Sequence, residues 1–277
     1  MIEREVTRRR FQVMVEGADA GIDLATAALL IAQEEYPDID TSKYLDRLQE
    51  MAATIESRLG RRRRPEDVIF SISSYLFHEQ GFKGNDRDYY DPRNSFLNDV
   101  LDRKLGIPIT LSLVYMEVAQ RIGFPIVGVG LPGHFIVKHP TSEKDLFVDP
   151  FQGGAMITEE ECKRLVEVVY RGSLIFRREF LRPLSKKAIL GRILGNLKRI
   201  YQGKGDHIRA LAAVERIVLL APDAPAEVRD RGLLSLRLHA YANAWRDLNT
   251  YREMVPNGED AQRIQEMLTA LERMRMN

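Results

Sequence analysis

The segment PITLSLVYMEVAQRI, residues 108–122, constrains the fold more than any other part of the chain. It is apolar on nearly every side of a helix, which is typical of a helix buried inside a core. After Gly123 the pattern changes to short runs rich in β-branched and aromatic residues, FPIVGVGL, HFIVKH and LFVDPF. Such runs are typical of strands. The sequence therefore predicts an α+β core in which three short strands pack against one buried helix.

Helices are also predicted before this core. Apolar residues recur at helical spacing in residues 24–32, in residues 44–55 and again after Pro65. The segment GFKGNDRDYYDPRNS that follows is polar and rich in turn formers, so a long surface loop is predicted from Gly81 to about Arg93. A capping box of Thr158 and Glu161 predicts a further helix after the strands.

The last ninety residues contain an internal repeat with an offset of 34 positions. Pro222 aligns with Pro256 and Ala210 with Ala244. Two helices per unit, closed by proline, resemble the tetratricopeptide repeat, and a generic helical bundle is the alternative. Units are predicted at 188–223 and 224–257, followed by a capping helix. We expect five side chains to pack between the units: Val214, Ile217, Trp245, Leu248 and Tyr251. The chain is thus divided into a helical segment (1–80), a core (81–184) and a repeat array (185–277).

Charge and cysteine content narrow the class of protein. A net charge of +1, from 41 basic and 40 acidic residues, argues against a surface devoted to nucleic acid. The run Arg61–Arg64 could contact phosphate, but it lacks interleaved aromatics and is interpreted as a solvated linker. The single cysteine, Cys162, is expected to be an ordinary helical thiol. Since neither a membrane span nor a signal peptide is recognisable, we expect a cytoplasmic protein without membrane contact.

No cofactor or metal site is predicted. Residues 128–133 have the G-x-G-x-x-G spacing of a dinucleotide fingerprint, but Pro132 interrupts it and a β-rich run follows where a helix is needed. We interpret these glycines as permitting a tight turn between strands. His134 and His139 are five residues apart on a predicted strand, so their side chains would face opposite ways and could not share an ion.

Three motifs resemble the core of transglutaminase-like proteins: RKLGIPITLSLVYMEVAQRIGFP, GVGLPGHFIV and LFVDPFQGG. Members of that family place Cys at a helix start, His on one strand and Asp on the next. With DLATAALLIAQEEYPDID upstream and the repeats downstream, nearly the whole chain is similar to the bacterial SirB-type family. The resemblance implies a transglutaminase-like fold and assigns the histidine and aspartate to His134 and Asp149. We predict that these two side chains are hydrogen bonded beside the start of the buried helix.

The position of the nucleophile departs from the family pattern. The family's helix opens with G-x-C, whereas this chain has Gly-Ile-Pro at 106–108, so Pro108 stands in the place of the cysteine. Proline carries no nucleophile, and thiol acyl transfer cannot run there. Ser112 lies one helical turn further on, where it is either a substitute nucleophile or a hydroxyl bonded to a backbone carbonyl.

Two other candidate residues each have two interpretations. His134 is either a base oriented by Asp149 or a buried imidazole that ties two strands together. Asn94 is either the N-cap of the helix that leads into the site or a ligand-binding residue.

The leading functional prediction is a non-catalytic transglutaminase-like protein that acts in protein–protein interaction or regulation. Its protein or peptide partner would bind the C-terminal repeats. The alternative is a hydrolase or amidase that uses His134 and Asp149 with a bound water or with Ser112. Nucleic acid is not expected as a partner.

Overall fold

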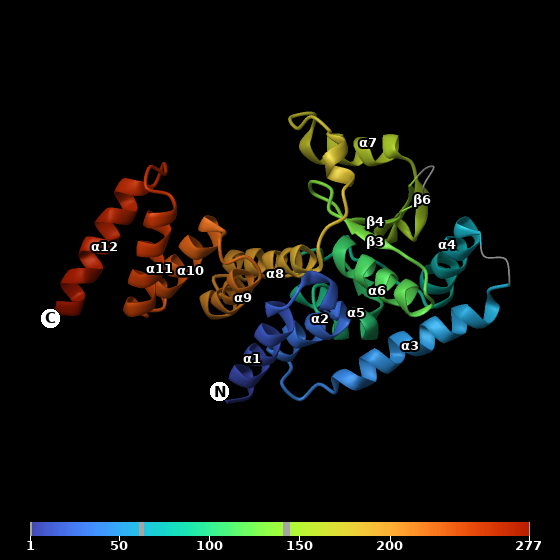
Figure 1. Ribbon diagram of the computed structural model, residues 1–277, viewed down its shortest axis with the longest axis horizontal. Helices are drawn as coiled ribbons and strands as arrows, with labels where there is room; N and C mark the ends of the chain where they lie inside the picture. The colour runs from blue at the N-terminus through green and yellow to red at the C-terminus, as the bar shows by residue number, and fades with distance from the viewer. Residues whose placement is uncertain (1, 61–63, 141–144, 277) are drawn as a thin grey trace. The chain divides into compact units, whose positions relative to one another are not determined.

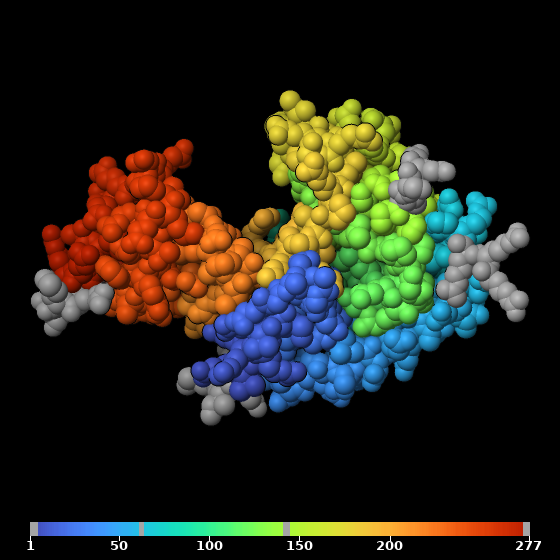
Figure 2. All heavy atoms as spheres, in the orientation of Figure 1, coloured from blue at the N-terminus to red at the C-terminus, as the bar shows by residue number. Residues whose placement is uncertain are grey.

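The computed structural model describes residues 2–60, 64–140 and 145–276, drawn as a ribbon (Figure 1) and with all heavy atoms as spheres (Figure 2). It divides the chain into two compact units, Met1–Ile193 and Leu194–Asn277. Most of the arginine run Arg61–Arg64 lies outside the described residues, and its last member, Arg64, directly precedes the helix that starts at Pro65. No helix of the described part is long and apolar enough to cross a membrane.

The first unit is mainly helical. Its α-helices are α1 (Ile2–Glu16), α2 (Leu24–Gln33), α3 (Thr41–Arg58), α4 (Pro65–Ser73), α5 (Leu97–Arg103), α6 (Pro108–Arg121) and α7 (Glu159–Tyr170). The starts of α2 and α3 are fixed by side-chain caps, because Asp23 accepts from Thr26 N and Asp40 accepts from Ser42 N. Helix α4 continues as the π-helical segment η2 (Ser74–Glu79).

Helix α6 is the centre of the core. Every residue from Pro108 to Ala119 is buried, as the apolar sequence of this helix predicts. Helices α2, α3, α4 and α5 pack on it, and strands of the sheet contact it as well (Figure 1). A helix surrounded in this way has no solvent-facing side before its last turn, which explains why most of its residues up to Ala119 are apolar.

One antiparallel sheet follows α6. Its strands run in chain order: β3 (Val127–Val129), β4 (Ile136–His139), β5 (Leu146–Asp149) and β6 (Ala155–Ile157). The three predicted strands are present. Strand β6 was not predicted, because it lies outside any longer run of β-branched and aromatic residues such as the one that contains β3. A second cluster of buried side chains joins the sheet to α7, and it includes Ile136, Phe147, Cys162 and Val166.

The loop predicted from Gly81 to Arg93 is only partly a surface loop. Strand β1 (Lys83–Gly84) pairs in parallel with β2 (Leu105–Gly106). Asn85 and Asp91 are buried, although their polarity suggests exposure. Each finds partners inside the protein, since Asn85 donates to Asn94 and Asp91 pairs with arginine side chains. The polar composition therefore did not reveal these two buried side chains, each of which is paired with a group inside the protein.

The repeats form the helices predicted for them. Helix α8 (Lys186–Gly203) runs from the first unit into the second, which continues with α9 (His207–Leu220), α10 (Pro225–Arg237), α11 (Tyr241–Met254) and α12 (Ala261–Met276). Of the five side chains expected to pack between units, four are buried: Val214, Ile217, Leu248 and Tyr251. The expectation is wrong for Trp245, which is only half-buried and whose indole N–H donates to Glu272 at 3.3 Å.

Helices α10 and α11 approach closely at Gly232. A Cβ atom there would lie 2.9 Å from Leu248 Cγ, closer than packed atoms allow. Nearby, Arg231 of α10 binds both carboxylate oxygens of the buried Asp247 of α11, each at 2.7 Å. The absence of a side chain at Gly232 thus lets α10 and α11 approach, and the two hydrogen bonds between Arg231 and Asp247 hold the helices together.

Candidate functional site

His134 and Asp149 form the centre of the candidate site. The two side chains are hydrogen bonded, with 2.8 Å between His134 Nε2 and Asp149 Oδ2, which confirms the predicted contact. Asp149 is the last residue of β5, but His134 is not on a strand as predicted. It follows the turn at Gly133, whose φ of 71° is the left-handed backbone that favours glycine.

The carboxylate of Asp149 is held from two sides. Its Oδ1 accepts from the backbone N–H groups of Phe151 at 3.0 Å and Gln152 at 3.3 Å, capping the short 3-10 helix η4 (Pro150–Gln152). Its side chain is 1% exposed. A carboxylate fixed in this way orients the imidazole of His134. The other imidazole nitrogen, Nδ1, makes no hydrogen bond to any described residue, so one polar atom of the ring remains for another group.

Aromatic rings border the imidazole. The ring centroid of Phe151 lies 6.1 Å from that of His134, in an edge-to-face arrangement. Tyr89 makes a similar contact with Phe151 at 6.4 Å, and Tyr90 packs edge-on against Tyr89. Because Tyr89 and Tyr90 belong to the segment between Gly81 and Arg93, this segment supplies one side of the site.

Pro108 is buried and begins α6, and η4 and β4 both pack against this helix. The helix start is fixed by Thr110, whose hydroxyl accepts from Ile107 N at 3.1 Å and donates to Asn94 O at 2.7 Å. Residue 108 therefore has a defined place at the N-terminus of the central helix. That this place faces His134 stays a prediction.

Ser112 is completely buried one turn after Pro108. Its hydroxyl has no hydrogen-bond partner among the described residues, so the expected bond to a backbone carbonyl is absent. An unpartnered buried hydroxyl is unusual and is often satisfied by an internal water. Within the described chain no hydrogen bond joins Ser112 to His134.

The N-cap interpretation of Asn94 is wrong. Helix α5 begins at Leu97, and Asn94 instead ends the 3-10 turn η3 (Pro92–Asn94). Its side chain is fully buried, with Oδ1 accepting from Asn85 Nδ2 at 3.0 Å and Nδ2 donating to Asp88 O at 2.7 Å. Both the oxygen and the nitrogen of this amide thus hold the loop together. The Asp-Pro pair that precedes Asn94 in the sequence is typical of such a turn and could have predicted it. Ligand binding by Asn94 stays a prediction.

Cys162 has the surroundings of a structural thiol. It is fully buried on α7, and the predicted capping box of Thr158 and Glu161 starts this helix. Burial, with a smaller contribution from the negative charge of Asp149, raises the pKa of the Cys162 thiol to about 12. A thiol that stays protonated at neutral pH is a poor nucleophile.

Sequence reasoning missed Arg192, which lies next to the candidate site. This residue is on α8, within the first unit, and its Nη2 donates to Leu131 O at 3.2 Å and to His134 O at 2.9 Å. The sequence offered no signal for this contact, because residue 192 falls inside the repeat pattern and far from His134 along the chain.

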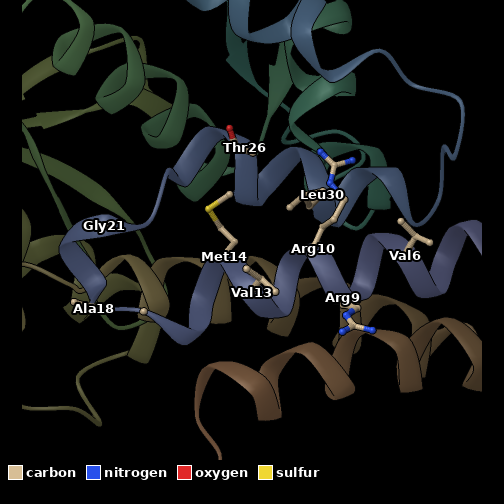
Figure 3. Close-up of a pocket in the computed structure, with 10 residues that line it drawn as sticks. Val6, Arg9, Arg10, Val13, Met14, Ala18, Gly21, Thr26 and Leu30 are labelled. Carbon is tan, nitrogen blue, oxygen red and sulfur yellow. The ribbon is translucent and has the colours of Figure 1, made fainter.

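A separate hollow of about 750 Å³ lies along α1 and α2 (Figure 3). Its lining is mostly apolar, and its only charged members are Arg9 and Arg10. Val6, Val13 and Met14 come from α1, whereas Thr26 and Leu30 come from α2 (Figure 3). None of these side chains can act as a base or an activated nucleophile, so the hollow is suited to binding rather than to catalysis. In the described part, no cluster of side chains could hold a metal ion.

Comparison with known proteins agrees with this architecture. Residues 42–195 match the transglutaminase-like superfamily. The chain belongs to that superfamily. Residues 197–269 of this transglutaminase-like protein match the tetratricopeptide repeat, which favours the repeat over a generic helical bundle. The fold class predicted from the sequence, an α+β transglutaminase-like core followed by a helical repeat array, is confirmed.

Relatives of this transglutaminase-like protein are bacterial and eukaryotic. A UPF0162 protein of Xylella fastidiosa is 36% identical over 261 residues, which cover 93% of both chains. A UPF0162 protein of Pseudomonas aeruginosa is 31% identical and covers 78% of both chains. F-box only protein 21 of Homo sapiens is 29% identical over 146 residues, which are half of this chain and 22% of that protein. No solved structure gives a significant match.

Proposed function

We propose that this chain is a non-catalytic transglutaminase-like protein that acts through protein contacts made by its C-terminal repeats. The observation that carries the proposal is Pro108 at the start of α6, where the family pattern has its nucleophilic cysteine. The chain has a single cysteine, and Cys162 is buried with a raised pKa. Thiol acyl transfer therefore has no attacking atom, although the hydrogen bond between His134 and Asp149 is kept.

The repeats supply the interaction part of the proposal. Tetratricopeptide repeats generally mediate contacts between proteins, and stacked repeats present extended binding surfaces. In the second unit the large apolar side chain of Ile208, on α9, is 64% exposed. Single exposed apolar residues are common on protein surfaces, so Ile208 serves as a probe of this face of α9 and does not itself indicate a partner.

The alternative is a hydrolase or amidase. Its support is the free Nδ1 of His134, which could activate a water, and the unpartnered hydroxyl of Ser112. A base of this kind needs its substrate within hydrogen-bond reach. Turnover is the property that separates the two proposals.

The first test measures hydrolysis of a peptide anilide by the full chain, by His134→Ala and by Arg178→Gln. Arg178 is an exposed arginine paired with Glu159, so it is a control in the same unit. We expect no turnover above buffer in any sample. Turnover that disappears in folded His134→Ala but persists in Arg178→Gln would establish the hydrolase instead.

The second test concerns the partner. The tagged full chain is used to capture proteins, in parallel with Ile208→Asp and with Val168→Asp, a substitution of a valine on α7 that is 77% exposed. We expect Ile208→Asp to lose captured proteins that the wild type and Val168→Asp retain. Equal capture by all three forms would contradict binding through this face of the repeats.

A further inference from the structure

Arg192 is a partly buried arginine with no carboxylate partner among the described residues. Burial lowers the pKa of its guanidinium, although not enough to discharge an arginine, and the neighbouring phenols of Tyr89 and Tyr170 act in the opposite direction. Its hydrogen bonds go to two backbone carbonyls, and it lies 5.5 Å from the Phe135 ring centroid. None of the described carboxylates pairs with it.

Other sheltered arginines of the same unit differ in this respect. Arg121 binds Glu117, Arg103 binds Asp91 and Arg8 binds Glu34, each through a carboxylate oxygen. Charged groups removed from water are normally paired in this way, because an unpaired buried charge is costly. Arg192 therefore differs from these three arginines in having no counter-charge among the described residues.

The geometry leaves part of the guanidinium available. Nη2 makes both carbonyl bonds, whereas Nη1 and Nε have no partner among the described residues. Gly130 is the reason that Nη1 can lie where it does, since a Cβ atom at this position would be 2.5 Å away from it. The planar guanidinium thus keeps free donors beside the turn that carries His134.

We infer that Arg192 forms a subsite for a carboxylate of a bound peptide next to His134, with Arg192 supplying both the charge and the donors. Because Nη2 is occupied by the two carbonyls, the carboxylate would accept charge-assisted hydrogen bonds from Nη1 or Nε. One positive charge balances one carboxylate. A phosphate dianion fits less well, because the carboxylate of Asp149 is bonded to the same imidazole and would repel the second negative charge.

The surroundings favour a peptide over a small free acid. The aromatic rings of Tyr89 and Phe151 lie on one side of the imidazole. At the end of α7, Val169 packs at Gly133, so that a Cβ atom at Gly133 would clash with it. Apolar contacts of this kind suit side chains that flank an acidic group. The inference rests on the proposed function in one respect, that the His134 region does not react, and it adds a second binding site to the contacts proposed for the repeats.

The experiment compares three blocked tripeptides with the full chain. Ac-Ala-Glu-Ala-NH2 carries only a side-chain carboxylate, Ac-Ala-Ala-Ala-OH only a terminal carboxylate, and Ac-Ala-Gln-Ala-NH2 neither. Binding is followed by the NMR signal of the His134 ring, assigned from its loss in His134→Ala. We expect at least one acidic peptide to shift this signal and the neutral peptide to leave it unchanged. The acidic peptide that binds identifies the source of the carboxylate.

Variants then test the role of Arg192. Arg192→Gln should weaken binding of the acidic peptide by about tenfold or more, the loss expected for a charge-assisted hydrogen bond, while Arg178→Gln should bind like the wild type. Arg192→Lys keeps the positive charge and can still donate to the carbonyls, but all of its donors are on one nitrogen. This variant should therefore bind the acidic peptide more weakly than the wild type does. Circular dichroism confirms that each variant is folded.

Several outcomes would overturn the inference. These are equal binding of acidic and neutral peptides, tighter binding of inorganic phosphate than of either acidic peptide, or unchanged binding in folded Arg192→Gln. If Arg192→Gln does not fold, wild-type affinity in Arg192→Lys has the same meaning. The proposed function and this subsite can fail separately. If the chain hydrolyses peptides but binding of the acidic peptide still depends on Arg192, the proposed function is wrong and the subsite is retained.

Discussion

Asp149 binds His134 with one carboxylate oxygen and the turn after β5 with the other. Oδ2 lies 2.8 Å from the imidazole Nε2, while Oδ1 accepts two backbone N–H groups. The aspartate therefore joins the end of one strand, the 3-10 turn η4 and the segment before β4. A single side chain holds the candidate site together, whether the site binds or reacts.

Asp149→Ala should lower the free energy of unfolding by about 2–4 kcal/mol, because it leaves two backbone N–H groups and the imidazole without their acceptor. His134→Ala should cost less, about 1–2 kcal/mol, since Asp149 keeps its backbone donors. Urea denaturation measures both. Glu79→Ala is the control, because Glu79 forms an exposed ion pair with Arg58 and should change stability by less than about 1 kcal/mol. An equal loss in the two site variants would mean that the imidazole bond dominates.

Pro108→Cys should restore a reactive thiol at the start of α6. The helix N-terminus favours a thiolate, and an imidazolium at His134 would lower the pKa of the new thiol further. Iodoacetamide should then label residue 108 at neutral pH faster than it labels the same residue in urea. Mass spectrometry of the labelled peptides measures the two rates.

Cys162 provides the internal control for that experiment. Its thiol is buried and its pKa is raised to about 12, so wild-type protein should be labelled only after unfolding. A double variant, Pro108→Cys with His134→Ala, separates the effect of the imidazole from that of the helix. If residue 108 reacts no faster in the folded protein than in urea, then the start of α6 does not face His134.

Long periodic segments made most of the fold predictable. The apolar sequence of α6 and the 34-residue offset of the repeats each extend over several turns, so tertiary contacts and local pattern agree. Strand β6 was missed because its three residues lie outside any longer run of β-branched and aromatic residues. The burial of Asn85 and Asp91 was missed because polar side chains with buried partners have the composition of a loop.

The candidate site was predictable only where the family motif covers it. His134 and Asp149 follow from that motif, and their contact is present. Asn94 was misassigned because a polar residue before a helix resembles an N-cap, whereas its partners lie upstream at Asn85 and Asp88. Arg192 could not be found, because its contact with His134 joins residues 58 positions apart and depends on where α8 begins.

The repeats allow a comparison between two neighbouring side chains of α11. Leu248 is fully buried, so Leu248→Ala should cost about 2–5 kcal/mol. Trp245 is half-buried and its indole bonds to Glu272, so Trp245→Ala should cost less, about 1–2 kcal/mol, despite the larger side chain. Thermal and urea unfolding of the full chain measure both. A larger loss for Trp245→Ala would show that its ring lies deeper between α11 and α12.

Lys104 predicts how stability depends on pH. Its ammonium lies 4.2 Å from the Phe82 ring centroid and binds Gln80 at 3.3 Å, with no carboxylate bonded to it. Burial, reinforced by the positive charge of Arg47, lowers the pKa of Lys104 to about 8. In the unfolded chain the pKa of a lysine is about 10.4. The folded protein therefore releases this proton at a lower pH than the unfolded chain.

The sign of the effect follows from proton binding. Below about pH 8 Lys104 is charged in both states, and the fold bears the full cost of a sheltered ammonium. As pH rises from about 8 to about 10.4, the unfolded chain binds more protons than the folded protein, so this cost is relieved. Lys104→Met should thus be more stable than wild type at pH 7, and its advantage should shrink by pH 9.5. Urea midpoints at the two pH values measure this, with Lys163→Met on the exposed face of α7 as control. A constant advantage at both pH values would mean that Lys104 titrates like an ordinary lysine.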